Sequence, residues 1–385
     1  MNYEEMKAQI QSEAALYFDE ICRLNDDIAD HPELSGLEYE TSKKIVEFLR
    51  SRQYDVVYPF NNMATALKAT YGRNHHHRKI ALLAEYDALP EIGHACGHSA
   101  ICSISILAAF ALAMLQDQLD ADIHIIGTPA EETYGGKCIM VEDGVFDQYD
   151  FAILVHPNNF SAPSANLLAL DSAIYDFCGK ASHAAAAPWE GNNALNAARL
   201  LFDSVDMFRQ HVKPDVRMHG VINSGGVAAN IVPDYSQVSM YTRSSDRYYL
   251  NEITKKVDTM AQCAAMMTGC TFKKTVPDKP FDNLKGNPVV EDVISDTFAE
   301  LKVPFTRTDT LFGSSDIGNV SFRCPAFHPV LKVSDAPIHT AEFAAIMKSD
   351  TLHSAIRTGA LLISYTIVKI FSNPALYEEM LAQFK

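Results

Sequence analysis

Short apolar runs alternate along the chain with longer stretches of helical spacing, and this alternation predicts an α/β fold. The runs Lys79–Tyr86, Ala121–Gly127 and Phe151–Val155 have the length of strands and end in polar or turn-forming residues. Runs that are apolar throughout are typical of strands covered on both faces by helices. The apolar stretch Ala100–Leu115 falls short of the roughly 20 residues that cross a bilayer, so it predicts a buried helix.

The middle of the chain has a different pattern of predicted strands and helices, which indicates a second domain. From about residue 171 to residue 282 we expect strands at Ser172–Gly179 and Ser236–Arg243 and helices at Asn193–Gln210 and Tyr249–Thr268. Strand–helix–strand–helix in roughly 110 residues fits a compact α+β insert with an antiparallel sheet. We therefore expect a discontinuous α/β domain at residues 1–170 and 286–385, interrupted by a smaller domain at residues 171–285.

The composition is that of an ordinary globular chain, and the charge excludes some partners. Hydrophobic residues make up 48% and charged residues 21% of the 385 positions, which excludes disordered and collagen-like classes. Acidic residues outnumber basic ones by 48 to 32, a net charge of −16. Because the sequence also has no Lys/Arg-rich run, we expect neither nucleic acid nor a membrane surface as a partner.

The first residues and the cysteines favour a cytoplasmic location. Residues 1–6 lack the positive flank and apolar run of a signal peptide. The eight cysteines are scattered through the chain without the dense spacing of a secreted disulfide scaffold. Each thiol is then either part of the core or a metal ligand.

Two short segments after the predicted strands carry residue types that bind metal or move protons. A thiolate and an imidazole in Cys96-Gly97-His98 can face one ion, and the pair suits Zn²⁺, Mn²⁺ or a related divalent ion. The adjacent acids Glu131 and Glu132 cannot share a dry pocket unless a cation neutralises one and a proton or water serves the other. One acid would then be a ligand and the other a general base. Each segment also has a purely structural alternative. Cys96 can be a buried core residue beside a His98 that caps a helix, and Glu131 and Glu132 can form an exposed acidic turn.

Two histidines at loop positions complete the candidate set. His156 ends the third apolar run, and His339 lies in Pro337–Glu342; each alone is more often a surface residue, and spacing cannot choose between His339 and the nearby His328 or His353. Together, however, one Cys, three His and two Glu would form a shell for two divalent ions. Such a pair of ions polarises a carbonyl and activates water while a carboxylate relays the proton, which is the chemistry of amide hydrolysis.

These segments together resemble the M20 metallopeptidase family. The closest branch is its amidohydrolase subfamily, which includes aminobenzoyl-glutamate hydrolase-like proteins and related dipeptidases. The resemblance covers most of the chain, in the family's order, and its motifs are Leu82–Pro90, Gly93–His98, Gly127–Glu132, His156-Pro157, Gly179–Ala185, Asn230–Pro233 and Gly313–Ser321.

The resemblance implies a two-metal catalytic α/β domain at residues 1–170 and 286–385 with an inserted lid and dimerisation domain at residues 171–285. Cys96 is similar to the family ligand that bridges the metals, and Glu131 to the general base. Asp87 resembles a second-layer carboxylate that orients a ligand, a role that imidazole ligands require in any case. The residues that resemble the terminal metal ligands are His98, Glu132, His156 and His339.

The resemblance also assigns three residues of the lid. His183 is similar to a donor to the developing oxyanion that is often delivered into the partner subunit's site, although a helix-entry cap is the alternative. Asn230 is similar to a residue that hydrogen-bonds the substrate. Arg243 resembles an arginine that clamps a substrate carboxylate, and a salt bridge to Asp246 is its alternative.

Some positions depart from the family pattern or stay open. Ser99 stands where many relatives carry Asp or Asn, and Glu85 stands where they often have Asp, so the contact of Glu85 with metal is open. The roles of Ser314, Ser315 and Asp316 are open as well. The polar run His75-His76-His77 favours a solvated loop over a metal site.

The sequence therefore predicts a cytoplasmic, metal-dependent amidohydrolase or dipeptidase. Its expected substrate is small and bears a carboxylate: a dipeptide, an N-acyl amino acid or an aminobenzoyl-glutamate-like compound. The expected cofactor is two divalent ions per subunit, zinc or manganese, and the expected assembly is a homodimer or a higher homo-oligomer formed through the lid. The alternative is a catalytically silent metal- or peptide-binding member of the fold, but the complete set of ligands and base favours an enzyme.

Overall fold

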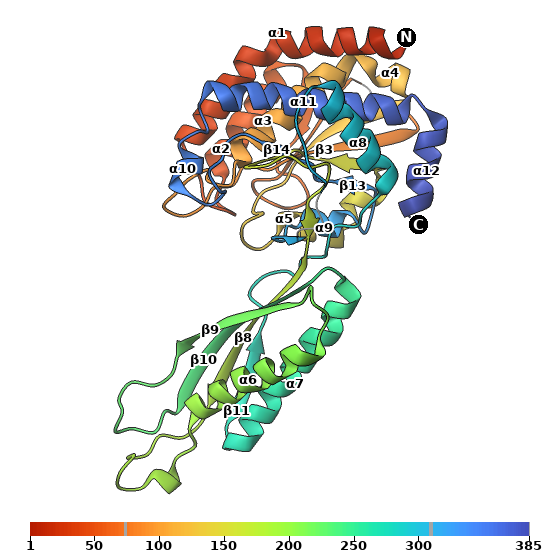
Figure 1. The fold of residues 1–385 in the computed structure, drawn as a ribbon. Helices are drawn as coiled ribbons and strands as arrows, with labels where there is room; N and C mark the ends of the chain where they lie inside the picture. The colour runs from red at the N-terminus through yellow and green to blue at the C-terminus, as the bar shows by residue number, and fades with distance from the viewer. Residues whose placement is uncertain (73–74, 308–310, 385) are drawn as a thin grey trace. The chain divides into compact units, whose positions relative to one another are not determined.

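The structure, a computed structural model, describes residues 1–72, 75–307 and 311–384, and the chain divides into two compact units (Figure 1). Unit 1 comprises Met1–Asn166, Leu284–Thr310 and Asp316–Lys385, and unit 2 comprises Leu167–Asn283 and Leu311–Ser315. The short segment Leu311–Ser315 therefore groups with the inserted unit, although the sequence offers no sign of this.

Unit 1 is built on a mixed six-stranded sheet with the strand order β1-β2-β4-β3-β5-β13. Strands β3, β4, β5 and β13 run parallel to one another, and β2 and β1 join antiparallel at one edge. The strands of unit 1 are β1 (Tyr54–Val57), β2 (Leu67–Tyr71), β3 (Arg78–Ala84), β4 (Ala121–Gly127), β5 (Phe151–Ile153), β6 (His156–Asn158), β13 (Ala326–Phe327) and β14 (Val330–Lys332).

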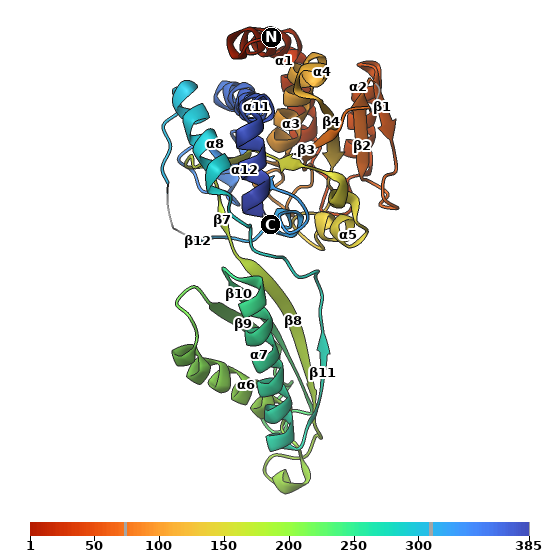
Figure 2. The ribbon, with the colours of Figure 1, turned by 90° about the vertical axis from the view of Figure 1, so that its right-hand side faces the viewer.

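Helices complete unit 1. They are α1 (Tyr3–Asp30), α2 (Tyr39–Ser51), α3 (His98–Leu112), α4 (Gln116–Leu119), α5 (Gly136–Glu142), α8 (Pro288–Glu300), α9 (Ile317–Val320), α10 (Ala341–Ala344), α11 (Asp350–Phe371) and α12 (Pro374–Phe384). Figure 2 shows α1, α3 and α11 side by side on one face of the sheet.

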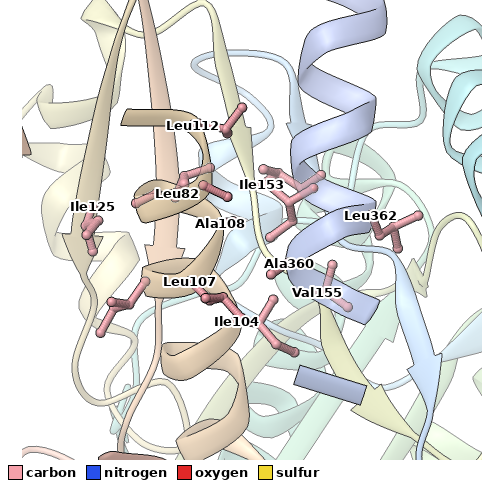
Figure 3. Packing of buried hydrophobic residues seen from close by; sticks show 14 of the residues in the cluster. Leu82, Ile104, Leu107, Ala108, Leu112, Ile125, Ile153, Val155, Ala360 and Leu362 are labelled. Atoms are coloured by element: carbon pink, nitrogen blue, oxygen red, sulfur yellow. The ribbon is translucent and has the colours of Figure 1, made fainter. Parts of the chain in front are cut away.

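Helix α3 is the centre of the core. It is buried along its whole length, because it packs on β3 and β4 with one side and on α1 and α11 with the other. Figure 3 shows Leu82 of β3, Ile104 and Leu107 of α3, and Ala360 of α11 as parts of one buried apolar cluster. A Cβ atom on Gly359 would lie 2.9 Å from the Ile104 side chain, so α11 approaches α3 closely where it has no side chain.

The apolar runs form the strands and the buried helix that the sequence predicts. Strand β4 spans the predicted Ala121–Gly127, while the predicted helix begins two residues early, at His98, and gives way to a 3₁₀ turn at Ala113–Leu115. The helical segments His98–Leu119 and Asp350–Phe371 are long and apolar enough to cross a membrane. Both lie mostly inside the core, as central helices of soluble proteins do, so their length is weak evidence for a membrane.

Unit 2 is an antiparallel sheet covered on one face by two helices (Figures 1 and 2). Its sheet has the order β11-β8-β10-β9, and buried and exposed residues alternate along β10. Its elements are β8 (Ala169–Cys178), α6 (Ala194–Phe208), β9 (Arg217–Ser224), β10 (Tyr235–Ser244), α7 (Arg247–Thr268) and β11 (Thr271–Thr275). Two further strands, β7 (Asn166–Leu167) and β12 (Leu311–Phe312), pair with each other.

Unit 1 contains a buried histidine that links stability to pH. His124 of β4 is 1% exposed, and its Nδ1 lies 2.9 Å from the Tyr149 hydroxyl. Burial, with the nearby Lys68 ammonium, lowers the pKa of His124 to about 3. The folded state therefore keeps this ring neutral at a pH where the unfolded chain, with a pKa near 6.5, has already bound a proton.

We predict that His124→Gln flattens the acid limb of the stability curve. The folded pKa lies below the unfolded one, so His124 costs nothing well above pH 6.5 and costs progressively more as the pH falls towards 3. Between pH 7 and pH 5 the wild-type protein should lose about 2 kcal/mol more unfolding free energy than the variant. Urea denaturation of the metal-free proteins measures this difference, and parallel pH profiles would contradict the prediction.

Candidate metal centre

The candidate residues of unit 1 gather at the carboxyl edge of the parallel strands. Glu85 and Asp87 follow β3, Glu131 and Glu132 follow β4, and His156 lies just past β5. Parallel strands bring their carboxyl ends to one edge, where ligands collect in open α/β sheets. Segments that are far apart in the sequence therefore meet at this edge.

Cys96 lies between two histidines. Its Sγ is 3.5 Å from His156 Nε2 and 3.2 Å from His339 Nε2. His156 Nδ1 lies 2.7 Å from the Pro157 carbonyl, and because a carbonyl can only accept, the ring proton is on Nδ1. The Nε2 lone pair of His156 consequently faces the thiol, as a metal ligand would require.

Asp87 orients a third histidine. One carboxylate oxygen of Asp87 lies 2.9 Å from His98 Nδ1, and the other accepts a hydrogen bond from the Glu132 backbone N–H at 3.0 Å. Because Nδ1 of His98 is engaged, Nε2 points away toward Glu132, whose Oε1 is 3.8 Å distant. A carboxylate that anchors the far nitrogen of an imidazole ligand is the usual second layer of a metal site.

The backbone is forced into the left-handed region at three points of the site. Gly97 has φ +83°, and a Cβ there would lie 3.2 Å from Pro157, so glycine lets Cys96 and His98 turn inward together. Ala130, just before the acidic pair, has φ +61°, and His339 has φ +64°. Such conformations cost free energy in residues other than glycine, and they concentrate at functional sites.

The pKa values of the two adjacent acids are shifted in opposite directions. Burial, with the neighbouring Glu132 carboxylate, holds the pKa of Glu131 well above its ordinary value. Burial also acts on Glu132, but His339 and His98 outweigh it and lower the pKa of that carboxyl. One acid of the pair is thus suited to carry a proton and the other to stay anionic, the division that the sequence suggests.

The donor set fits divalent metal ions. Three groups of potential ligand atoms each lie within 4.8 Å: Cys96 with His98 and His156, Cys96 with Glu132 and His339, and His98 with Glu131 and Glu132. His98 Nε2 and Glu132 Oε1 are buried and have no hydrogen-bond partner among the described residues. Because a buried polar atom without a partner is costly, these two atoms fit a site that a divalent cation would compensate.

A buried ion cluster that the sequence does not reveal supports the site. Lys137 of α5 is 0% exposed, and its Nζ lies 2.7 Å from Glu85 Oε1 and 2.5 Å from Asp316 Oδ1. The Lys137 backbone N–H also donates to Asp316 Oδ2 at 2.9 Å. The other oxygen of Glu85 lies 3.6 Å from His98 Nε2, so the cluster borders the ligands directly.

Spacing could not choose between three histidines, but the structure separates them. His339 lies at Cys96, whereas His353 contacts Asp26 at 2.8 Å. His328 is buried with its ring centre 5.2 Å from that of His156, so it borders the site without entering any of the ligand groups found among the described residues. Buried His94, from the motif before Cys96, is a further neighbour that sequence reasoning missed.

The three residues predicted for the lid, His183, Asn230 and Arg243, all lie in unit 2, whereas the candidate metal ligands lie in unit 1. The backbone N–H groups of Ala185 and Ala186 donate to His183 Nδ1 at 3.3 and 3.1 Å, so the ring proton is on Nε2. The N–H of Ala184, the residue after His183, donates to the Asn230 carbonyl at 2.9 Å. His183 and Asn230, both predicted from the sequence, therefore lie on adjacent segments.

Arg243 does not form the salt bridge to Asp246 that is the alternative to its role in substrate binding. Asp246 instead caps α7, accepting from the backbone of Tyr248 and Tyr249. Arg243 donates to Ser314 Oγ at 3.1 Å, and among the described residues it makes no ion pair. It lines a cavity of about 680 Å³ in unit 2 together with His219 and Tyr241.

Comparison with known proteins agrees with these observations. The model of peptidase family M20/M25/M40 matches residues 81–363. The chain is 35% identical to a mouse Xaa-Arg dipeptidase, over 80% of this chain and 73% of the relative. It is 26% identical to one of the p-aminobenzoyl-glutamate hydrolase subunits of Escherichia coli, over 92% and 89% of the two chains.

Solved structures share the fold. A dinuclear metal-binding peptidase of the M20 family from Bacillus subtilis superimposes with a TM-score of 0.66 at 18% identity, over 91% of this chain and 99% of that one. An aminobenzoyl-glutamate utilization protein from Klebsiella pneumoniae gives a TM-score of 0.69 at 18% identity, over 91% and 98%.

We predict that Lys137→Met destabilises the protein by about 3–5 kcal/mol, because it leaves the carboxylates of Glu85 and Asp316 buried without their cation. Urea denaturation of metal-free protein measures the loss. The matched control is Lys43→Met, which removes an exposed pair with Glu40 and should leave the unfolding free energy nearly unchanged. Adding Asp316→Asn to Lys137→Met should restore part of the stability. Equal stability of the two single variants would contradict the role assigned to Lys137.

Proposed function

The chain belongs to peptidase family M20/M25/M40 and is a metal-dependent hydrolase of amide or peptide bonds, and we propose that its substrates are dipeptides with a free C-terminal carboxylate. The observation that carries the proposal is the convergence of a thiol, imidazoles and carboxylates around Cys96, in a chain 35% identical to an Xaa-Arg dipeptidase.

We propose two ions per subunit, zinc or manganese. Cys96, like His98 and Glu132, belongs to two of the ligand groups, and its sulfur would serve both ions as the resemblance to the family implies. His98, His156, Glu132 and His339 would complete the coordination. Thiolate and imidazole donors suit zinc, and the carboxylate also accepts manganese. Bound there, the ions would polarise the scissile carbonyl and lower the pKa of water.

Glu131 is proposed as the general base. Its carboxylate oxygen lies within 4.8 Å of the His98 and Glu132 ligand atoms. Glu131 would take one proton from the water as the oxygen–carbon bond forms. It would then give that proton to the leaving nitrogen as the carbon–nitrogen bond breaks.

His183 is proposed as the donor to the oxyanion. Its Nδ1 accepts from the backbone, which leaves the Nε2–H to donate. Asn230, on the adjacent segment, is proposed to hydrogen-bond the substrate. Both side chains belong to unit 2, and domain closure or a second subunit would bring them to the ligands.

Arg243 is proposed to bind the substrate carboxylate. Among the described residues Arg243 forms no ion pair, and it lines a cavity. A fork of N–H donors matches a carboxylate in geometry and charge. Every unmodified dipeptide presents this group one residue away from the scissile bond.

A basic C-terminal residue is the first substrate feature to test. The mouse relative is named for Xaa-Arg dipeptides, and the net charge of −16 would attract a cationic substrate. An aminobenzoyl-glutamate-like substrate is the second candidate, since the relative from Escherichia coli aligns with 92% of this chain.

We propose that the protein acts as a homo-oligomer in the cytoplasm. Strand β9 is an edge of the unit 2 sheet, and an open strand edge can pair with a second copy of the chain. The eight cysteines lack the dense spacing of a secreted disulfide scaffold, which supports a reducing compartment.

We predict that protein reconstituted with zinc or manganese hydrolyses Xaa-Arg dipeptides, and that Glu131→Gln lowers kcat by about 10²–10⁴-fold while metal remains bound. The reason is that Glu131 moves the proton and the ligands hold the ions. A screen of dipeptides, N-acyl amino acids and aminobenzoyl-glutamate measures activity, and elemental analysis measures metal content.

The controls separate chemistry from metal loss. Chelated wild-type protein should be inactive, and Glu132→Gln should lose both metal and activity because Glu132 is a proposed ligand. Full activity of Glu131→Gln would contradict the assignment of the base. Absence of hydrolysis across the reconstituted screen would favour a catalytically silent binding protein.

We predict that Arg243→Met raises KM about 10–100-fold for a dipeptide with a free carboxylate, because a charge-assisted hydrogen bond is lost. The same dipeptide with a C-terminal amide serves as the control, since it lacks the group that Arg243 would bind. Wild-type protein should discriminate between the two substrates, and the variant should not. Equal discrimination by both proteins would contradict the carboxylate clamp.

A further inference from the structure

A second cluster of potential metal ligands lies at the opposite end of β3 from the candidate metal centre. Strands β3 and β4 are parallel, with Arg78 opposite Ala121, so residues 75–77 lie beside the start of β4 and the turn that precedes it. This register places His75-His76-His77 against the segment that contains Asp117, Asp120 and Asp122. The seven residues of β3 separate the two places by roughly 20 Å, so the clusters are distinct.

Three atoms in this second cluster are arranged as ligands. His76 Nε2 lies 3.0 Å and His75 Nε2 lies 3.8 Å from the same oxygen, Oδ1 of Asp117. All three ligand atoms lie within 4.8 Å of one another. Neighbouring ligands of a tetrahedral ion with bonds near 2 Å are separated by a little over 3 Å, so a small adjustment would fit an ion.

Asp122 fixes the orientation of the central imidazole. Its side chain is 2% exposed, and Oδ1 lies 2.7 Å from His76 Nδ1 while accepting from the backbone N–H groups of His75 and His76. The carboxylate therefore engages Nδ1 of His76 and directs Nε2 toward Asp117. A carboxylate behind an imidazole is what a histidine ligand requires of its surroundings.

A solvated loop, which the sequence favours, would not need this arrangement. In a solvated loop the rings point into water independently, whereas here His76 is held between two carboxylates with its side chain only 7% exposed. His77, by contrast, is 90% exposed, and its Nδ1 lies 3.2 Å from the exposed Asp120 carboxylate. The loop therefore contains an organised pair of histidines and a solvated one.

We propose that His75, His76 and Asp117 form a peripheral site for a divalent transition-metal ion, zinc in the first instance, that joins the loop before β3 to α4. Two imidazoles and one carboxylate suit zinc, nickel or copper, and three protein ligands leave a position for water. The site is separate from the catalytic ligands and does not rest on the proposed function.

The test is a Zn²⁺ titration of the metal-free full chain by competition with a chromogenic chelator. Wild-type protein should bind one equivalent more than Asp117→Asn or His75→Gln, both of which alter exposed side chains. Asp120→Asn is the matched control, because it removes the same charge beside His77 and leaves the three ligands intact, and it should bind as wild type does. Equal numbers of equivalents in wild type, Asp117→Asn and His75→Gln would overturn the proposal.

Chemical modification gives a second readout that does not depend on activity. Saturating Zn²⁺ should protect His75 and His76 from diethylpyrocarbonate, as mapped by mass spectrometry, and leave His77 reactive. Equal protection of the three histidines, or no protection of any, would overturn the assignment of the ligands.

Discussion

The burial of acidic side chains at the carboxyl edge of the parallel strands is the constraint on which the site depends. Glu85, Asp87, Glu131 and Asp316 are all buried, and a buried carboxylate costs several kcal/mol unless cations or hydrogen bonds compensate it. Lys137 compensates two of them, and the His98 ring and the Glu132 N–H compensate Asp87. What is left are two buried atoms, His98 Nε2 and Glu132 Oε1, that have no hydrogen-bond partner among the described residues, and a divalent ion would compensate both.

The scaffold holds these groups at the expense of local strain. Ala130 and His339 both adopt positive φ, which costs of order 1–3 kcal/mol each outside glycine. The His339 N–H donates to the Ala95 carbonyl at 2.8 Å, so the strained residue is tied to the loop that carries Cys96. Rigid parallel strands and buried α3 supply the stability that such strain needs.

The sequence predicts those parts of the fold and site that depend on residues close together in the chain. Continuous apolar runs specify β3, β4 and α3, because burial on both faces leaves a mark on neighbouring residues. Cys96 with His98, and Glu131 with Glu132, are likewise neighbours in the sequence. The Lys137–Asp316 pair joins residues 179 positions apart, and a buried lysine looks like a surface lysine in a sequence. The short strand β2 and the segment Leu311–Ser315 were missed for the same reason, since β2 is defined by its pairing with the distant β4 and Leu311–Ser315 by its grouping with unit 2.

The two histidine clusters share one structural feature, a carboxylate that orients an imidazole, although one cluster is buried and the other is exposed. In each, an acceptor engages Nδ1 and aims Nε2: Asp87 for His98 in the buried centre, and Asp122 for His76 at the periphery. The composition of His75-His76-His77 could not distinguish the aimed rings from the solvated one, because the aiming carboxylate lies 46 positions away from His76. Burial would set how firmly each cluster holds an ion, since water would compete at the exposed Asp117 and not at the buried Cys96. The orientation of the imidazoles and the strength of binding are therefore separate properties, and only the first is shared by the two clusters.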